Sequence, residues 1–235
     1  MPSRWDTVTV DDGAMRCYVG VPAGAGPYPA VVVIQHAGGV DEFTRTMSDR
    51  FASAGYLGVA PELYHRETAE ESGDDPLTRM GRLRDANIVV DVSAAIDHTS
   101  GLPEVASDRV GIAGFCMGGR VAYLMATHSP ALKAAVVLYG GNILVPWGEG
   151  PAPFDRTEQI QCAVLGLFGE QDTNPSPADV AKLDAELTRL KVVHEFHSYA
   201  PVGHAFMYWA RPGYREEVAE DAWGKCIAWL GRQLR

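Results

Sequence analysis

An unbroken apolar run, AVVVIQ at residues 30–35, is the feature that most constrains the fold of this chain. A strand with one face in water alternates apolar and polar residues, whereas a strand buried on both faces of a parallel sheet is apolar throughout. Strand-like and helix-like patterns then alternate almost to the end of the chain, which is typical of a mostly parallel sheet covered by helices on both faces. We therefore expect residues 1–235 to form a single α/β domain.

The expected elements follow one another in a regular order. Strands are expected at residues 7–10, 15–21, 30–35, 56–60, 109–113, 134–139, 162–168 and 192–198. Helices are expected at residues 42–55, 78–99, 117–127, from 176 onward, and at 216–234. Two irregular stretches, 64–76 and 140–157, interrupt the alternation and are expected to overhang a site.

The net charge and the hydropathy of the chain argue against nucleic acid and membranes as binding partners. The net charge of −10 argues against nucleic acid and anionic membrane surfaces, since both need a basic face. No apolar run approaches the roughly 18 residues of a membrane span. The first ten residues, MPSRWDTVTV, lack the apolar core of a signal peptide, so we expect a cytoplasmic protein.

Neither the cysteines nor the histidines form a pattern that predicts a metal site. The four cysteines are widely spaced and contain no C-x-x-C pair, which argues against a zinc knuckle or a disulfide framework. His194 and His197 have opposite parity in one expected strand, so their side chains should face opposite ways. His65, His98 and His128 are expected at the surface or at helix ends.

The segment GFCMGG, residues 114–119, follows an expected strand and begins an expected helix. Ligands of open α/β sheets bind at the carboxyl ends of strands, and G-x-C-x-G in that place matches a nucleophile elbow with sulfur in place of oxygen. The helix N-terminus would favour a Cys116 thiolate, and the Met117 N–H would be one oxyanion donor. A small cysteine that only packs at a glycine-rich helix entry is the alternative.

Two later residues follow strands in the chain order of α/β-hydrolases. Asp172 lies in FGEQD after the strand 162–168, and His204 lies in GHAF after the strand 192–198. Asp172 would hold the imidazole tautomer, while His204 would take the thiol proton and later activate water. A turn-forming aspartate or a loop histidine is possible for either residue alone, but the joint order favours a triad with Cys116.

Six segments carry a resemblance to a known family: VVVIQHAGGVDEFTR (31–45), FASAGYLGVAPELYHR (51–66), GFCMGGRVA (114–122), LYGG (138–141), FGEQD (168–172) and GHAF (203–206). On these segments the chain resembles the dienelactone hydrolase family, which is carboxymethylenebutenolidase-like. The resemblance implies an α/β-hydrolase fold, the triad Cys116, His204 and Asp172, and a second oxyanion donor from the Ala37 N–H. It also implies cleavage of lactones or small carboxylic esters without metal or cofactor.

Two positions depart from the family's pattern. His36 stands where the family typically has a glutamate that helps control protonation of the cysteine, and Tyr208 stands where dienelactone-cleaving members carry a carboxylate-binding arginine. The family's other such arginine falls in the region of three candidates for which helix-surface roles fit equally well: Arg79, Arg82 and Arg84. A site with His36 and Tyr208 should hold a fixed carboxylate less strongly than paired arginines do, so a neutral ester or another lactone fits as well.

We expect a hydrolase that acts on a small-molecule ester or lactone through a thioacyl-enzyme on Cys116, as a monomer or a small homo-oligomer. The expected substrate contacts are His36, Trp147, Phe206 and Tyr208. A thioesterase or a C–C bond hydrolase on the same scaffold is an alternative. So is a non-catalytic binding or redox-sensing protein in which Cys116 is merely oxidisable.

Overall fold

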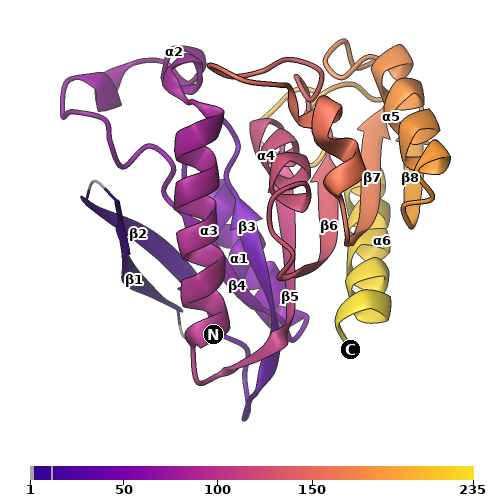
Figure 1. Ribbon diagram of the computed structural model, residues 1–235. Helices are drawn as coiled ribbons and strands as arrows, with labels where there is room; N and C mark the ends of the chain where they lie inside the picture. Colours follow the sequence, from indigo (N-terminus) through magenta and orange to yellow (C-terminus); the bar gives the residue numbers. More distant parts are fainter. Residues whose placement is uncertain (1–2, 12) are drawn as a thin grey trace.

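The computed structural model describes residues 3–11 and 13–235 and contains one eight-stranded sheet, in the order β1-β2-β4-β3-β5-β6-β7-β8 (Figure 1). The strands are β1 (Ser3–Val10), β2 (Gly13–Gly20), β3 (Tyr28–Ile34), β4 (Leu57–Pro61), β5 (Val105–Phe115), β6 (Leu132–Leu138), β7 (Ala163–Gly169) and β8 (His194–Tyr199). β2 is antiparallel to both β1 and β4, while all pairs from β4 to β8 are parallel. The predicted mostly parallel sheet is confirmed.

Helices cover both faces of this sheet (Figure 1). The helices are α1 (Glu42–Ser53), α2 (Pro76–Arg82), α3 (Asp85–Gly101), α4 (Met117–Ala126), α5 (Pro177–Arg189) and α6 (Glu216–Leu234), with 3-10 turns at Glu71–Gly73 and Pro153–Gln159. One buried cluster contains apolar residues of α3, α4 and α5, and a second contains those of α1 and α6. Among the described residues, none of these helices has the length and apolar character to cross a membrane.

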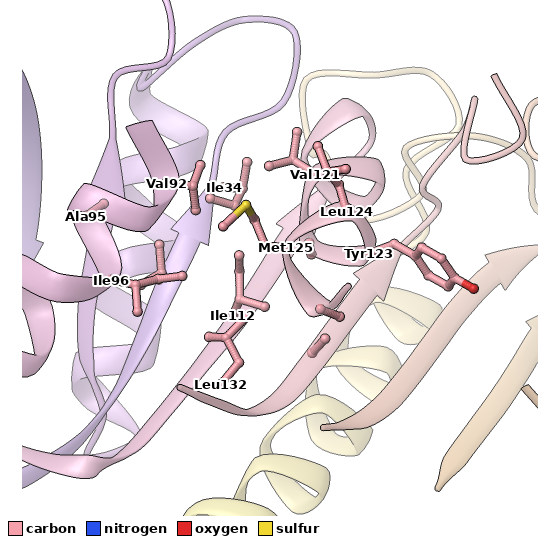
Figure 2. Close-up of a cluster of buried hydrophobic side chains, with 14 of the residues drawn as sticks. Ile34, Val92, Ala95, Ile96, Ile112, Val121, Tyr123, Leu124, Met125 and Leu132 are labelled. Carbon is pink, nitrogen blue, oxygen red and sulfur yellow. The ribbon is translucent and has the colours of Figure 1, made fainter. Parts of the chain in front are cut away.

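Burial on both faces explains the apolar run of β3. Val32 and Ile34 belong to the cluster under α3 and α4, whereas Val31 and Val33 belong to the cluster under α1 and α6. Figure 2 shows Ile34 near Val92 of α3, within the first of these clusters. A strand at the centre of a parallel sheet has no face in water, which removes the usual alternation.

The prediction of one long helix at residues 78–99 is wrong, because the chain forms two helices there, α2 and α3. Leu83 and Arg84 have extended backbone angles between α2 and α3. The Asp85 N–H donates to the carbonyl of Trp147 at 2.7 Å, so it does not continue a helical ladder from α2. The apolar spacing alone could not show this tertiary contact.

The parallel strands end at a common edge, and this edge positions the site. Gly114 of β5 pairs with Ile34 of β3 on one side and with Val137 of β6 on the other. The loops after β3, β5, β7 and β8 therefore leave the sheet on the same side. This is the edge at which the sequence places its candidate residues.

Candidate active site

Cys116 lies directly after the central strand β5, at the turn into α4. Its backbone angles, φ 58° and ψ −120°, are unusual for a residue with a side chain. The Cys116 N–H donates to the Leu138 carbonyl at 3.0 Å, and the Cys116 carbonyl accepts from the Gly119 N–H at 2.9 Å. A strained backbone fixed by hydrogen bonds on both sides is typical of functional turns, and the side chain keeps partial solvent access.

The glycines around Cys116 are required by close backbone contacts. A Cβ on Gly114 would lie 1.8 Å from the Gly118 carbonyl oxygen, and a Cβ on Gly118 would lie 2.4 Å from the oxygen of Ile34. A Cβ on Gly119 would lie 2.8 Å from the Cα of Gly140. The turn is therefore as tight as the sequence pattern predicts, and α4 starts against the ends of β3 and β6.

Asp172 follows β7 and is almost completely buried, with 3% of its side chain exposed. Its Oδ1 accepts from the Asn174 N–H at 2.9 Å, and its Oδ2 lies 2.7 Å from Nδ1 of His204. The end of β7 approaches the loop after β8 so closely that a Cβ on Gly169 would lie 2.5 Å from the Val202 oxygen. The carboxylate is thus held in one orientation toward the imidazole.

His204 lies between the acid and the thiol. Nδ1 lies 2.7 Å from Oδ2 of Asp172, and the Cys116 side chain is close enough to help raise the pKa of the ring. Burial lowers the pKa of His204, but the hydrogen bonds to Asp172 and Cys116 outweigh burial and raise the pKa to about 10. The structure therefore brings together the three residues of the predicted triad and favours a charged imidazolium between them.

Tyr139 and Phe206 form the wall behind the imidazole. The Tyr139 ring meets the His204 ring edge-on at 5.3 Å and meets the Phe206 ring at 5.1 Å. Phe206 has no exposed surface, so it supports Tyr139 and, in contrast to the prediction, presents no surface to a substrate. Tyr139, which the sequence reading did not single out, directly follows β6, and its strand-end position was the available signal.

The His36 side chain, at the position where the family typically has a glutamate, hydrogen-bonds within its own loop. Its Nε2 lies 2.8 Å from Oδ2 of Asp41, and its Nδ1 accepts a long hydrogen bond from the Gly38 N–H at 3.4 Å. Nδ1 therefore carries no proton and Nε2 donates to Asp41. The ring also meets Tyr208 edge-on at 5.0 Å. His36 stabilises the loop after β3, which contains Ala37.

The other predicted contacts lie at different places around the edge. Tyr208 is half-buried against Phe43 and His36. Trp147 lies beneath the guanidinium of the fully buried Arg120, at 4.0 Å, and is partly exposed. Both remain candidates for substrate contact.

The three arginines considered from the sequence all have partners. Arg79 pairs with Glu67 at 2.7 Å and stacks on the Tyr64 ring at 4.2 Å, lining a cleft of about 280 Å³. Arg82 contacts Asp74, Glu71 and Glu67, and Arg84 donates to backbone carbonyls of its own turn. Of the three, Arg79 is the one that lines this cleft together with Gly38 and Gly39 of the loop after β3.

The remaining histidines make structural contacts. The His65 side chain is 7% exposed and its Nε2 lies 3.2 Å from the Asp91 carboxylate, so it does not take the surface position expected for it. His194 faces Asp184 and His197 faces Glu195. Within the part of the chain that the structure describes, no group of three His, Cys, Asp or Glu side chains could hold a metal ion.

A mostly parallel sheet, a strained residue after its central strand and an Asp–His pair after the last two strands define the α/β-hydrolase class. A family model described as "Dienelactone hydrolase family" matches residues 15–234. A protein of Klebsiella pneumoniae, described as "Putative Dienelactone Hydrolase", is 32% identical with a TM-score of 0.88, over 98% of both chains. An esterase of Pyrobaculum calidifontis, 16% identical with a TM-score of 0.78 over 100% of this chain and 87% of its own, shares the fold.

Sequence relatives agree with the family model. A protein of Methylorubrum extorquens named "Putative carboxymethylenebutenolidase" is 33% identical over 95% of this chain and 78% of its own. A Synechocystis protein of the same name is 36% identical over 88% of this chain and 87% of its own. The chain belongs to the dienelactone hydrolase family and is a carboxylic ester or lactone hydrolase.

Proposed function

We propose that this hydrolase cleaves a small neutral ester or lactone through a thioacyl-enzyme on Cys116. The observation that carries the proposal is the strained backbone of Cys116 together with His204, whose Nδ1 lies 2.7 Å from the buried Asp172 carboxylate and whose pKa Cys116 helps to raise. Covalent acyl transfer requires a nucleophile, a proton carrier and an acid that orients it, and Cys116, His204 and Asp172 would take these roles.

In the first step the Cys116 sulfur attacks the carbonyl carbon, and an S–C bond forms. The oxyanion accepts hydrogen bonds from the N–H groups of Met117, at the free N-terminus of α4, and of Ala37. The C–O bond to the leaving group breaks, and its oxygen takes the proton from His204. Because His204 favours its charged form, the resting pair already holds this proton.

In the second step water attacks the thioester. His204 accepts a proton from the water, the S–C bond breaks, and the sulfur leaves as a thiolate. The proton on His204 restores the starting pair, so the net reaction is one ester and one water giving one acid and one alcohol. Asp172 holds Nδ1 throughout and stabilises the imidazolium.

The charges near the site favour a substrate without a fixed carboxylate. Arg79, which lines the cleft beside the loop after β3, is already paired with Glu67, and Tyr208 offers a hydroxyl in place of a guanidinium. A paired arginine attracts a further anion less than a free one does, because its charge is already balanced. A thioesterase or C–C hydrolase would use the same residues, and substrate preference separates these activities.

The test uses purified enzyme with p-nitrophenyl acetate, a neutral lactone, a carboxylate-bearing dienelactone and short acyl thioesters. We expect the neutral ester or lactone to have the highest kcat/KM, and Cys116→Ala and His204→Ala to abolish turnover. Mass spectrometry of the quenched reaction should show an acyl adduct on Cys116. Undiminished hydrolysis by Cys116→Ala would refute the mechanism, and a strong preference for the dienelactone would refute the substrate class.

A further inference from the structure

Tyr64 touches both segments that form the proposed oxyanion hole. It follows β4, the neighbour of β3, and is 8% exposed. Its hydroxyl donates to the Ala37 carbonyl at 3.0 Å and lies 3.5 Å from the Met117 sulfur. One hydroxyl therefore connects the loop after β3 with the first residue of α4, which are far apart in the sequence.

The loop that contains Ala37 is fixed at several points, and Tyr64 provides one of them. The His36 carbonyl accepts from the Gly39 N–H at 3.0 Å, which fixes the peptide group before Ala37. The Tyr64 hydroxyl fixes the peptide group after Ala37. The Tyr64 ring also packs beside Gly39, whose φ is +90°, since a Cβ added to Gly39 would lie 3.6 Å from the ring. Without the hydroxyl, the second peptide group loses its side-chain anchor.

The Tyr64 side chain is itself held in place and remains a donor. The Arg79 guanidinium stacks on its ring at 4.2 Å and is anchored by Glu67 at 2.7 Å. Burial raises the pKa of Tyr64 well above its ordinary value, so the hydroxyl keeps its proton at any working pH. A single proton shared between a carbonyl and a thioether goes mainly to the carbonyl, because sulfur is the weaker acceptor.

We propose that Tyr64 is a positioning residue that holds the Ala37 and Met117 N–H groups at the spacing an oxyanion requires. This inference rests on the proposed function, because it assumes that both N–H groups bind the tetrahedral intermediate. Preorganised donors act on charge that develops in the transition state, so a loss of spacing slows the chemistry more than it weakens substrate binding.

Tyr64→Phe tests the proposal because it removes only the hydroxyl. We expect kcat on p-nitrophenyl acetate to fall by about tenfold or more, less than the 10²–10³ typical for loss of a whole donor. KM and the thermal unfolding midpoint should change little. Tyr56→Phe is the matched control, since Tyr56 is a fully buried tyrosine near Gly231 of α6, and its hydroxyl has no hydrogen-bond partner among the described residues.

The rate of Cys116 alkylation by iodoacetamide separates positioning from a general structural role. Alkylation depends on the thiolate and its partner His204 and forms no oxyanion. We expect Tyr64→Phe to be alkylated at the wild-type rate while its kcat is reduced. An unchanged kcat, or equal losses of kcat and alkylation rate, would overturn the role of Tyr64. Hydrolysis that survives in Cys116→Ala would instead overturn the proposed function.

Discussion

At the scale of single residues, the proposed mechanism depends on the charge state of His204. Its pKa is raised from 6.5 to about 10, against the effect of burial, by hydrogen bonds to Asp172 and Cys116. In the proposed mechanism, an imidazolium paired with the Cys116 thiolate is the proton donor that the leaving group needs in the first step. We therefore expect activity to fall as the pH rises through about 10, where His204 loses this proton.

Asp172→Asn should move this falling limb to lower pH. The substitution keeps the size of the side chain but removes the carboxylate that most strongly raises the pKa of His204. The pH at which activity declines should shift toward the ordinary histidine pKa of 6.5. The kcat should fall by at least about tenfold, because the imidazole loses its orientation. The measurement is kcat/KM against pH. Asp184→Asn, which removes the carboxylate facing His194 at 3.3 Å, is the control and should leave the profile unchanged.

The same shift predicts a pH dependence of stability. A pKa raised in the folded state means that folding favours the protonated form of His204, so this contribution is complete below pH 6.5. It is lost progressively as the pH rises through about 10. Urea unfolding across this range should show a decrease in the free energy of unfolding that is smaller in His204→Ala. Equal pH dependence in the two proteins would contradict the assigned shift.

At the scale of elements, the backbone of the turn between β5 and α4 fixes the position of Cys116. The strained angles of Cys116 are possible because its flanking residues, Gly114 and Gly118, have no Cβ to clash with neighbouring carbonyls. The same absence lets α4 begin against the end of β3, at the carboxyl edge of the sheet. Strain at this turn is balanced by the packing of the fully buried α4.

Two glycine-to-alanine substitutions in helices should have opposite effects. Gly118→Ala places a Cβ 2.4 Å from the Ile34 oxygen, so we expect a loss of about 1–3 kcal/mol or more in the free energy of unfolding, together with a loss of activity. Gly224→Ala lies in α6 with nothing within 4 Å of the new Cβ, and should gain roughly 0.5–1 kcal/mol with normal activity. Chemical denaturation and esterase assays measure both. A stabilised, active Gly118→Ala would contradict the tight turn.

At the scale of the whole molecule, one buried guanidinium joins three distant segments. Arg120 of α4 is completely buried and donates to Asp85 at the start of α3, with distances of 2.6 and 2.9 Å. It also donates to the carbonyls of Asn142 and Val145, in the loop after β6, while the Trp147 ring covers it. This cluster holds α3, α4 and that loop in one arrangement beside the site.

Breaking the buried pair should be costly, and removing both charges much less so. Arg120→Met leaves the Asp85 carboxylate without its charged partner, so we expect a loss of about 3–5 kcal/mol. The double variant Arg120→Met with Asp85→Leu should recover part of this loss, because no unpaired charge stays buried. Urea unfolding of the two single variants and the double variant measures the coupling. Strictly additive effects would show that the pair makes no specific contribution.

Part of the fold and of the candidate site could be predicted from the sequence. The order of elements and the strand-end positions of Cys116, Asp172 and His204 came from periodicity and chain order, because parallel strands end at one edge of the sheet. The break at Leu83 and the burial of Phe206 could not be predicted in this way, since each depends on a partner distant in sequence. The catalytic role of the triad stays a prediction until the variants are measured.

The sequence by itself determined the α/β architecture, the glycines around Cys116 and the order of its candidate partners. These are properties of local backbone geometry, of the apolar patterns of strands and helices, and of chain order. Only the tertiary structure decided which groups the loop side chains meet: that His36 turns to Asp41 and that Tyr64 reaches Ala37. Beyond the end of a strand no period fixes the direction of a side chain, so the packing of neighbouring loops decides it.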